Sequence, residues 1–120
     1  MNKEGFRIVE IFKYRRRTIV IVEASWLTNE SIYHNGYVSC RLSSGEVEYE
    51  STYSKITADE ATYEGYFGKE WDHPDIPHDL WFLGFDSVHS WNDEIPESKT
   101  LESVRERAKR FADDMIRCRI

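Results

Sequence analysis

The chain has 120 residues, of which 40% are hydrophobic and 32% charged, and its formal net charge is −6. Its longest apolar run, residues 19–22, is far shorter than the ~20 residues that span a bilayer, and no apolar stretch follows a basic N-terminus. We therefore expect a single soluble, cytoplasmic domain over residues 1–120, with no membrane segment and no export signal.

The N-terminal part of the chain predicts a β-hairpin. Residues 6–13 and 18–24 are rich in Ile, Val and Phe, and a short polar break separates them at Tyr14-Arg15-Arg16-Arg17. Residues 19–22 are apolar on both alternating faces. That pattern is typical of a strand inside a sheet that is covered on both sides.

Further strands are predicted in the middle of the chain. After a loop over residues 25–35, Asn35-Gly36 indicates a tight turn, because Asn and Gly tolerate positive φ. Residues 37–42 would form the next strand. Residues 46–50 alternate Glu with apolar residues, as in a strand with one solvent-exposed face. A weaker pattern favours another strand over residues 61–66.

The second half begins with an acidic loop over residues 72–79, where Pro74 and Pro77 disfavour regular structure. Residues 80–85 are short, aromatic and bounded by polar turns, which predicts a buried strand. Gly84 within this strand indicates a bulge or a close backbone approach.

A C-terminal helix is predicted over residues 101–117, with Thr100 as its N-cap. Its apolar residues form one stripe that should pack on the sheet: Leu101, Val104, Ala108, Phe111, Ala112 and Met115. The opposite side should be a solvated basic face: Arg105, Arg107, Lys109 and Arg110. The expected fold class is α+β, mainly an antiparallel sheet packed by one C-terminal amphipathic helix.

Charge is distributed unevenly along the chain. Residues 41–97 hold 14 acidic residues against three basic ones, a net charge of −11, and the remainder carries +5. Such an acidic middle disfavours direct contact with a nucleic-acid backbone but suits a basic protein groove. The alternative is a merely soluble surface. The predicted acidic binding surface comprises Glu46, Glu48, Glu50, Asp72, Asp75 and Asp79.

An alternative site lies in the segment 84–93, which directly follows the predicted buried strand. Asp86, His89 and Asp93 could bind a metal or form an acid–base set in which a carboxylate orients the histidine. The alternative, which we favour, is that the two acids cap turns while His89 hydrogen-bonds the backbone. The nearby pair His73 and His78 matches no recurrent zinc spacing and is interpreted as part of a solvated loop.

Signatures of enzymes and cofactors are absent from the sequence. It has no Gly-x-Ser-x-Gly elbow and no Gly-rich phosphate loop, so we predict a non-enzymatic protein without a cofactor. Cys40 and Cys118 lie far apart and are interpreted as reduced structural thiols, with a bridge between them as the alternative. Basic runs at residues 14–17 and 105–110 could contact phosphate groups, although a charged hairpin tip and a solvated helix face are the favoured interpretation.

Three blocks covering about 70 residues carry a resemblance: Gly36-Tyr37-Val38, then Gly84-Phe85-Asp86-x-x-His89-x-x-x-Asp93, then a helix with Leu101, Val104 and Ala108. Together they resemble a family of small uncharacterised proteins found in bacteriophages and prophages. That family often has His-Gly-Gly where this chain has Tyr63-Glu64-Gly65, and its last acid sits closer to the histidine. Both departures argue against carrying a catalytic role over.

The resemblance implies a phage accessory context in the cytoplasm of a host cell. Combined with the acidic middle, it predicts a protein that binds and inhibits a host protein, such as a counter-defence, anti-CRISPR-like factor that acts on a nucleic-acid-binding effector. A metal-binding domain or metal-dependent enzyme centred on residues 84–93 is the alternative. The oligomeric state is left open by the sequence.

Overall fold

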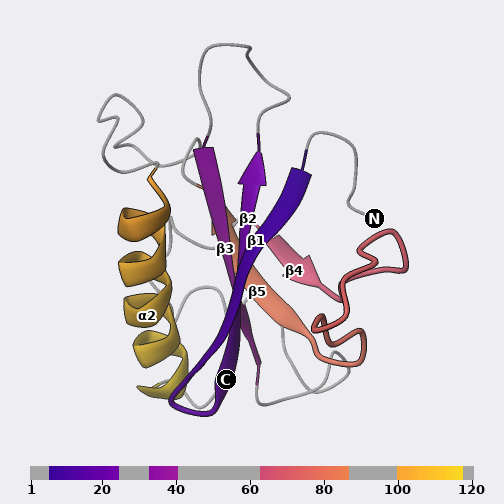
Figure 1. Cartoon of the computed structure of the whole chain (residues 1–120). Coiled ribbons are helices and arrows are strands. Elements are labelled where there is room, and N and C mark those ends of the chain that lie inside the picture. Colours follow the sequence, from indigo (N-terminus) through magenta and orange to yellow (C-terminus); the bar gives the residue numbers. More distant parts are fainter. Residues whose placement is uncertain (1–5, 25–32, 41–62, 87–99, 118–120) are drawn as a thin grey trace.

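The computed structural model describes residues 6–24, 33–40, 63–86 and 100–117 (Figure 1). Five strands form one sheet in the order β1-β2-β3-β5-β4, and every neighbouring pair is antiparallel. A helix, α2, follows the last strand, so the predicted α+β fold class is confirmed. No helix within these residues has the length and apolar character needed to cross a bilayer. The elements are β1 (Phe6–Tyr14), β2 (Arg17–Ala24), β3 (Tyr33–Ser39), β4 (Tyr63–Gly65), β5 (Phe82–Asp86) and α2 (Leu101–Arg117).

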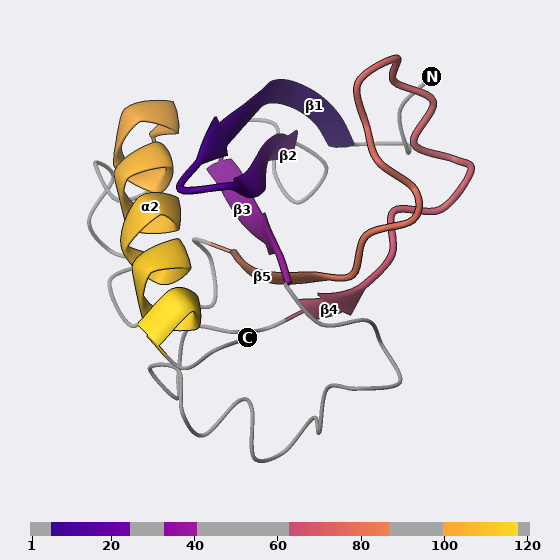
Figure 2. The same ribbon diagram turned by 90° about the horizontal axis from the view of Figure 1, so that it is seen from below.

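Two different layers cover the sheet. The helix α2 lies on one face, and the loop that joins β4 to β5 lies on the other, as Figures 1 and 2 show from two directions. Ile19 and Ile21 of β2 pack in the helix-side core, whereas Val20 and Val22 pack in the loop-side core. The prediction that residues 19–22 are covered on both sides is therefore confirmed, and β2 lies inside the sheet between β1 and β3.

The predicted hairpin is confirmed, with a two-residue turn between β1 and β2. Both turn residues have positive φ, 50° at Arg15 and 67° at Arg16. Left-handed backbone costs a residue with a side chain about 1–2 kcal/mol, and hairpin turns of this kind usually contain Asn-Gly. Asp113 of α2 accepts hydrogen bonds from the Arg15 guanidinium at 2.7 Å and from the Tyr14 hydroxyl at 3.1 Å. These bonds, that from Arg15 foremost, lower the pKa of the Asp113 carboxyl.

A β-bulge in β1 places two consecutive residues, Val9 and Glu10, on the helix side of the sheet. The register with β2 shifts between Ile8 and Glu10, which interrupts the alternation of faces. Ile8 before the bulge and Ile11 after it both pack in the loop-side core, while Val9 packs in the helix-side core. Glu10 then receives two hydrogen bonds from the Arg105 guanidinium of α2, at 2.7 and 2.6 Å.

The predicted turn at Asn35-Gly36 is wrong, since both residues lie inside β3 and pair with strands on either side. The strand predicted for residues 37–42 correspondingly begins earlier, at Tyr33. Gly36 is needed for space: a Cβ there would lie 2.7 Å from the ring of Phe85. On β5, a Cβ on Gly84 would collide with the ring of Tyr37, the residue it pairs with in β3. The two glycines therefore each accommodate an aromatic ring from the neighbouring strand, on opposite faces of the sheet.

The predicted helix is confirmed over residues 101–117, and the Ser103 N–H donates to the Thr100 hydroxyl oxygen as an N-cap bond. The prediction that its basic face is simply solvated is wrong for two residues. Arg105 forms an ion pair with Glu10, and the guanidinium of Arg107 lies 4.4 Å from the centre of the Phe85 ring. Both residues flank the apolar stripe, and their long side chains reach back to the sheet.

Candidate functional site

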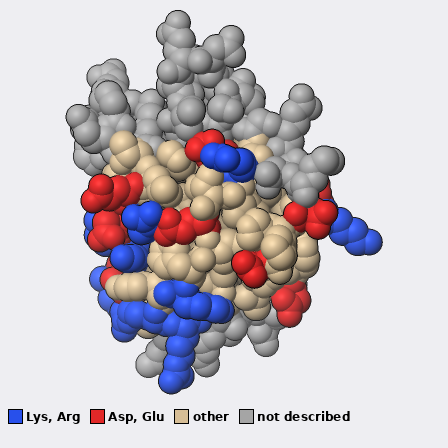
Figure 3. Space-filling view, in the orientation of Figure 1, with Lys and Arg blue, Asp and Glu red and all other residues tan. Residues whose placement is uncertain are grey.

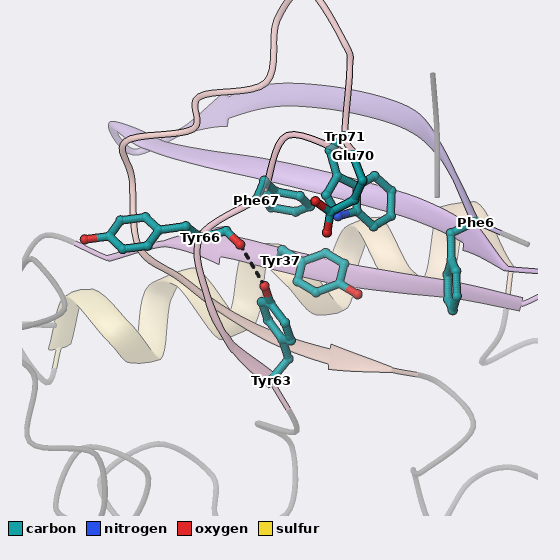
Figure 4. Close-up of a pocket in the computed structure, with 7 residues that line it drawn as sticks. All are labelled: Phe6, Tyr37, Tyr63, Tyr66, Phe67, Glu70 and Trp71. Carbon is teal, nitrogen blue, oxygen red and sulfur yellow. Dashed lines mark hydrogen bonds between the residues drawn. The ribbon is translucent and has the colours of Figure 1, made fainter. Parts of the chain in front are cut away.

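A small cavity opens on the loop-covered face of the sheet, at the side of the molecule opposite α2 (Figure 4). Its volume is about 190 Å³. Six of its seven lining residues are aromatic and the seventh is a glutamate. We call this cavity the aromatic pocket; it is lined by Phe6, Tyr37, Tyr63, Tyr66, Phe67, Glu70 and Trp71.

The walls of the aromatic pocket come from elements that are distant in sequence. Phe6 begins β1, Tyr37 lies in β3 and Tyr63 begins β4, and the remaining residues belong to the loop after β4. The ring of Tyr37 meets that of Tyr63 edge to face, with centroids 5.2 Å apart. It also meets Phe67 at 5.3 Å with an interplanar angle of 76°. Such perpendicular contacts are a favoured aromatic geometry and present ring faces at right angles.

A hydrogen bond to the backbone fixes the position of the Tyr63 side chain. Its hydroxyl donates to the backbone carbonyl of Tyr66 at 3.0 Å. The side chain of Tyr66 points away from the pocket in Figure 4, and its ring packs edge to face on Trp81 with centroids 4.8 Å apart. Tyr66 therefore lines the pocket with its backbone, and five rings supply the aromatic walls.

Glu70 supplies the negative charge of the aromatic pocket. A Cβ on Gly68 would collide with the Glu70 carboxylate, so the side chain folds back over this glycine. Burial, and then the charge of Glu70, raise the pKa of the Tyr63 hydroxyl. At neutral pH the pocket therefore combines neutral hydroxyls, ring faces and one carboxylate.

This combination is suited to a cation. The faces of Trp, Tyr and Phe rings attract ammonium and guanidinium groups, more strongly where water is excluded. Pockets for drug-sized ligands usually measure about 300–1,000 Å³, so a cavity of about 190 Å³ has room for a side-chain head group only.

Part of the predicted acidic surface lies on the loop that supplies residues of the aromatic pocket. Asp72, Asp75 and Asp79 are exposed on the loop that carries Glu70 and Trp71, as predicted for residues 72–79. The loop is not wholly exposed, however. Ile76 is 6% exposed and Trp71 8%, and both pack in the loop-side core. These two apolar residues anchor the loop to the sheet and leave its acids in solvent.

Other predicted site residues lie outside the described residues: Glu46, Glu48, Glu50, His89 and Asp93. Asp86 ends β5 opposite Asn35, but its side chain is not described either. The convergence of Asp86, His89 and Asp93 stays a prediction. Cys40 is buried next to β3, and Cys118 is outside the described residues, so their pairing is likewise untested.

The histidines of the 72–79 loop make backbone contacts. The ring nitrogen Nδ1 of His73 accepts a hydrogen bond from the Asp75 N–H at 3.1 Å, and Nδ1 of His78 lies 2.8 Å from the carbonyl of Phe67. Within the described parts of the chain, no three His, Cys, Asp or Glu residues are grouped so as to hold a metal ion. Both histidines therefore stabilise the conformation of the loop through contacts with its backbone.

Sequence reasoning missed the aromatic pocket. The dense aromatic and acidic composition of residues 63–71 was the available signal, but Phe6 and Tyr37 are brought to it only by the sheet. Comparison of the chain with known protein families, with curated proteins and with solved structures found no match.

Proposed function

We propose that this protein is a non-enzymatic binding domain that takes a cationic side chain, Lys or Arg, of a partner protein into the aromatic pocket. The observation that carries the proposal is the pocket itself: five aromatic rings and the carboxylate of Glu70 surround a cavity the size of a side-chain head group. Aromatic rings and a single carboxylate together recognise a cation without requiring full burial of an ion pair.

The surroundings of the pocket support a basic partner. Asp72, Asp75 and Asp79 are exposed on the same loop as Glu70. Carboxylates around a binding site raise the local concentration of basic segments and speed their association. A short Lys- or Arg-containing segment would place one side chain in the pocket and its other charges against this loop.

The partner that fits the sequence is a host protein. The resemblance to phage and prophage proteins supports this proposal, as does the net charge of −11 over residues 41–97. A basic groove that normally accepts nucleic acid would present the Arg and Lys side chains that the pocket and its acidic rim accept. In that version the protein inhibits a nucleic-acid-binding defence effector by occupying its groove.

The test uses two nearly isosteric probes, N-acetyl-arginine methylamide and N-acetyl-citrulline methylamide, followed by NMR. We expect the charged arginine probe to shift the resonances of Tyr37, Tyr63 and Trp71, and the neutral citrulline probe to leave them unchanged. Equal shifts with both probes would show that charge is not recognised and would contradict the proposal.

A pair of charge-matched variants locates the binding. Glu70→Gln removes the pocket carboxylate, and we expect it to weaken binding of the arginine probe about fivefold, equivalent to ~1 kcal/mol. Asp75→Asn removes the same charge from an exposed position of the same loop and should change the affinity much less. If both variants lose affinity equally, the loop attracts cations only through its total charge.

A further inference from the structure

A second cavity lies at the other end of the sheet, beside the β1–β2 turn, and has a volume of about 550 Å³. Lys and Arg side chains gather at the lower end of the face in Figure 3, where Figure 1 places this turn. Four of the five residues 13–17 contribute positive charge to this one hollow. We call it the basic cavity; its basic lining residues are Lys13, Arg15, Arg16 and Arg17.

Two of the basic side chains, Lys13 and Arg16, have no acidic partner among the described residues. Arg15 pairs with Asp113 at 2.7 Å, but Lys13 donates to the uncharged hydroxyl of Thr18 at 2.6 Å. Arg16 makes no ion pair with any residue in the described ranges. An anion that enters the cavity would therefore meet the positive charges of Lys13 and Arg16, which no acidic side chain among the described residues neutralises.

One cation of the basic cavity is held in place before any ligand arrives. Arg17 is 8% exposed, and its guanidinium donates to the backbone carbonyl of Ser39 at 3.1 Å. The Thr18 N–H donates to the Ser39 hydroxyl at 2.9 Å, which ties the start of β2 to the end of β3. A guanidinium fixed by such contacts loses little conformational freedom when it binds an oxyanion.

The turn itself favours a binding role. Arg15 and Arg16 both adopt positive φ, a conformation for which Asn and Gly are the ordinary residues. The backbone geometry thus gives no reason for arginine at either position; Arg15 pairs with Asp113, whereas Arg16 has no such partner among the described residues. Strained backbone of this kind is concentrated at functional sites.

We propose that the basic cavity binds the phosphate group of a small organic phosphate. Its volume falls within the range of about 300–1,000 Å³ found for small-molecule sites. Arg16 and Lys13 would contact the phosphate oxygens through charge-assisted hydrogen bonds. Leu80, Ile116 and Cys40 add apolar surface for the uncharged part of the ligand, and the polar residues Thr18 and Ser39 complete the lining. This site lies apart from the aromatic pocket, with which it shares no lining residue.

Calorimetry at low ionic strength with ADP, inorganic phosphate and adenosine tests the site. ADP should bind, phosphate should bind more weakly and adenosine should not bind. Arg16→Gln should weaken ADP binding about tenfold, because one charge-assisted contact is lost. Arg110→Gln, which removes an equal charge from an exposed position of α2, should have less than about a twofold effect. Absence of ADP binding, or equal losses in both variants, would overturn the proposal.

Two further measurements distinguish a small-molecule phosphate site from a nucleic-acid surface and from a folding defect. An oligothymidylate of about ten nucleotides should bind no more tightly than ADP. Tighter binding with a steep salt dependence would instead assign the surface to a nucleic-acid strand and overturn the proposal. In Arg15→Asn/Arg16→Gly, ADP binding should be lost while the melting temperature rises, so that loss of binding cannot be attributed to unfolding. ADP binding retained by this folded double variant would also overturn the proposal.

Discussion

The two faces of the sheet are covered in different ways. On the helix side, α2 inserts an apolar stripe that is fully buried, 0% exposed at each of Val104, Ala108, Phe111, Ala112 and Met115. On the loop side, a segment without regular structure is attached mainly through aromatic rings, and exposed Tyr63 borders a cavity there. These five positions of α2 therefore leave no open space, and the helix contributes only Ile116 to the basic cavity at its end, whereas the loop side keeps open space next to a carboxylate.

The difference follows from the chemistry of the covering segments. A helix with period 3.6 presents small and branched side chains that interdigitate with a pleated sheet and leave little space. The loop after β4 instead covers its face with a few large rings that meet at right angles, such as Phe67 with Trp71 at 84°, and the aromatic pocket lies among them. We infer that the buried stripe of α2 stabilises the fold and that the loop side carries recognition of a cation.

The largest effect is expected when one phenylalanine is truncated on each face. Phe111→Ala should lower the free energy of unfolding by about 3–5 kcal/mol, because a fully buried ring that packs on Phe85 is removed. Under conditions where the variant is folded, its affinity for the arginine probe should equal that of the parent. Urea unfolding and NMR titration measure the two quantities.

Phe67→Ala is the matched change on the loop side. Phe67 is 2% exposed and lines the aromatic pocket, so this variant should lose both stability and binding of the arginine probe. The stability loss should be smaller than for Phe111→Ala, because a loop that adjoins a cavity can relax more easily than a packed helix. Loss of probe binding in Phe111→Ala, or its retention in Phe67→Ala, would contradict the division between the faces.

The two glycines that face aromatic rings allow a subtler comparison. A methyl group at Gly36 presses on Phe85 beneath α2, whereas one at Gly84 presses on Tyr37 in the aromatic pocket. Each substitution by Ala should cost about 1–3 kcal/mol through overpacking.

The binding consequences of these two substitutions should differ. Gly84→Ala should displace the Tyr37 ring and weaken binding of the arginine probe, while Gly36→Ala should leave the affinity for the probe unchanged. Thermal melting measures the stability of the two variants, and NMR titration measures their affinity for the arginine probe. Equal effects on binding would mean that strain at β3 and β5 spreads across the sheet instead of acting on one face.

Much of the fold could be predicted because it depends on local periodicity. Residues 19–22 indicate a strand covered on both sides, and the stripe of α2 indicates its packing face. Asn35-Gly36 misled the prediction because the same dipeptide serves two purposes. Gly provides positive φ in turns, but in β3 it provides room for the Phe85 ring.

The aromatic pocket could not be predicted in the same way. Phe6 and Tyr37 lie 31 positions apart and meet Tyr63 only through the sheet order β1-β2-β3-β5-β4. The acidic-surface prediction included Asp72 of the loop that follows β4, but it passed over Glu70, the acid that lines the cavity. A scan for acids among clustered aromatic residues would have found five of its seven lining residues: Tyr63, Tyr66, Phe67, Glu70 and Trp71.

The hairpin turn tests whether the two arginines that line the proposed phosphate site lower the stability of the fold. Replacing Arg15 and Arg16 with Asn and Gly should raise the free energy of unfolding by about 1–2 kcal/mol, because Asn and Gly adopt the positive-φ turn at a lower cost than arginine. The exposed pair between Arg15 and Asp113 contributes little against this gain. Unfolding in urea provides the measurement. A decrease in stability would indicate that the arginines hold the hairpin to α2.

The smallest expected effect on stability is the alkaline titration of Tyr63. Burial and Glu70 raise its pKa, so the folded state holds the phenolic proton more tightly than the unfolded state. The resulting stabilisation is fully present below about pH 10 and is lost as pH rises through the folded-state pKa. Because the chain has seven tyrosines, the Tyr63 ring is followed individually, through the pH dependence of its own NMR resonances.

Glu70→Gln removes one of the two causes of the raised pKa, and the NMR titration of Tyr63 should move to lower pH. Saturating arginine probe should move it in the same direction, because a cation in the aromatic pocket stabilises the phenolate. Asp75→Asn should leave the curve in place. If neither Glu70→Gln nor the probe changes this titration, the charge of Glu70 and the bound cation both lie away from Tyr63. Recognition of the cation could then no longer be assigned to the loop side.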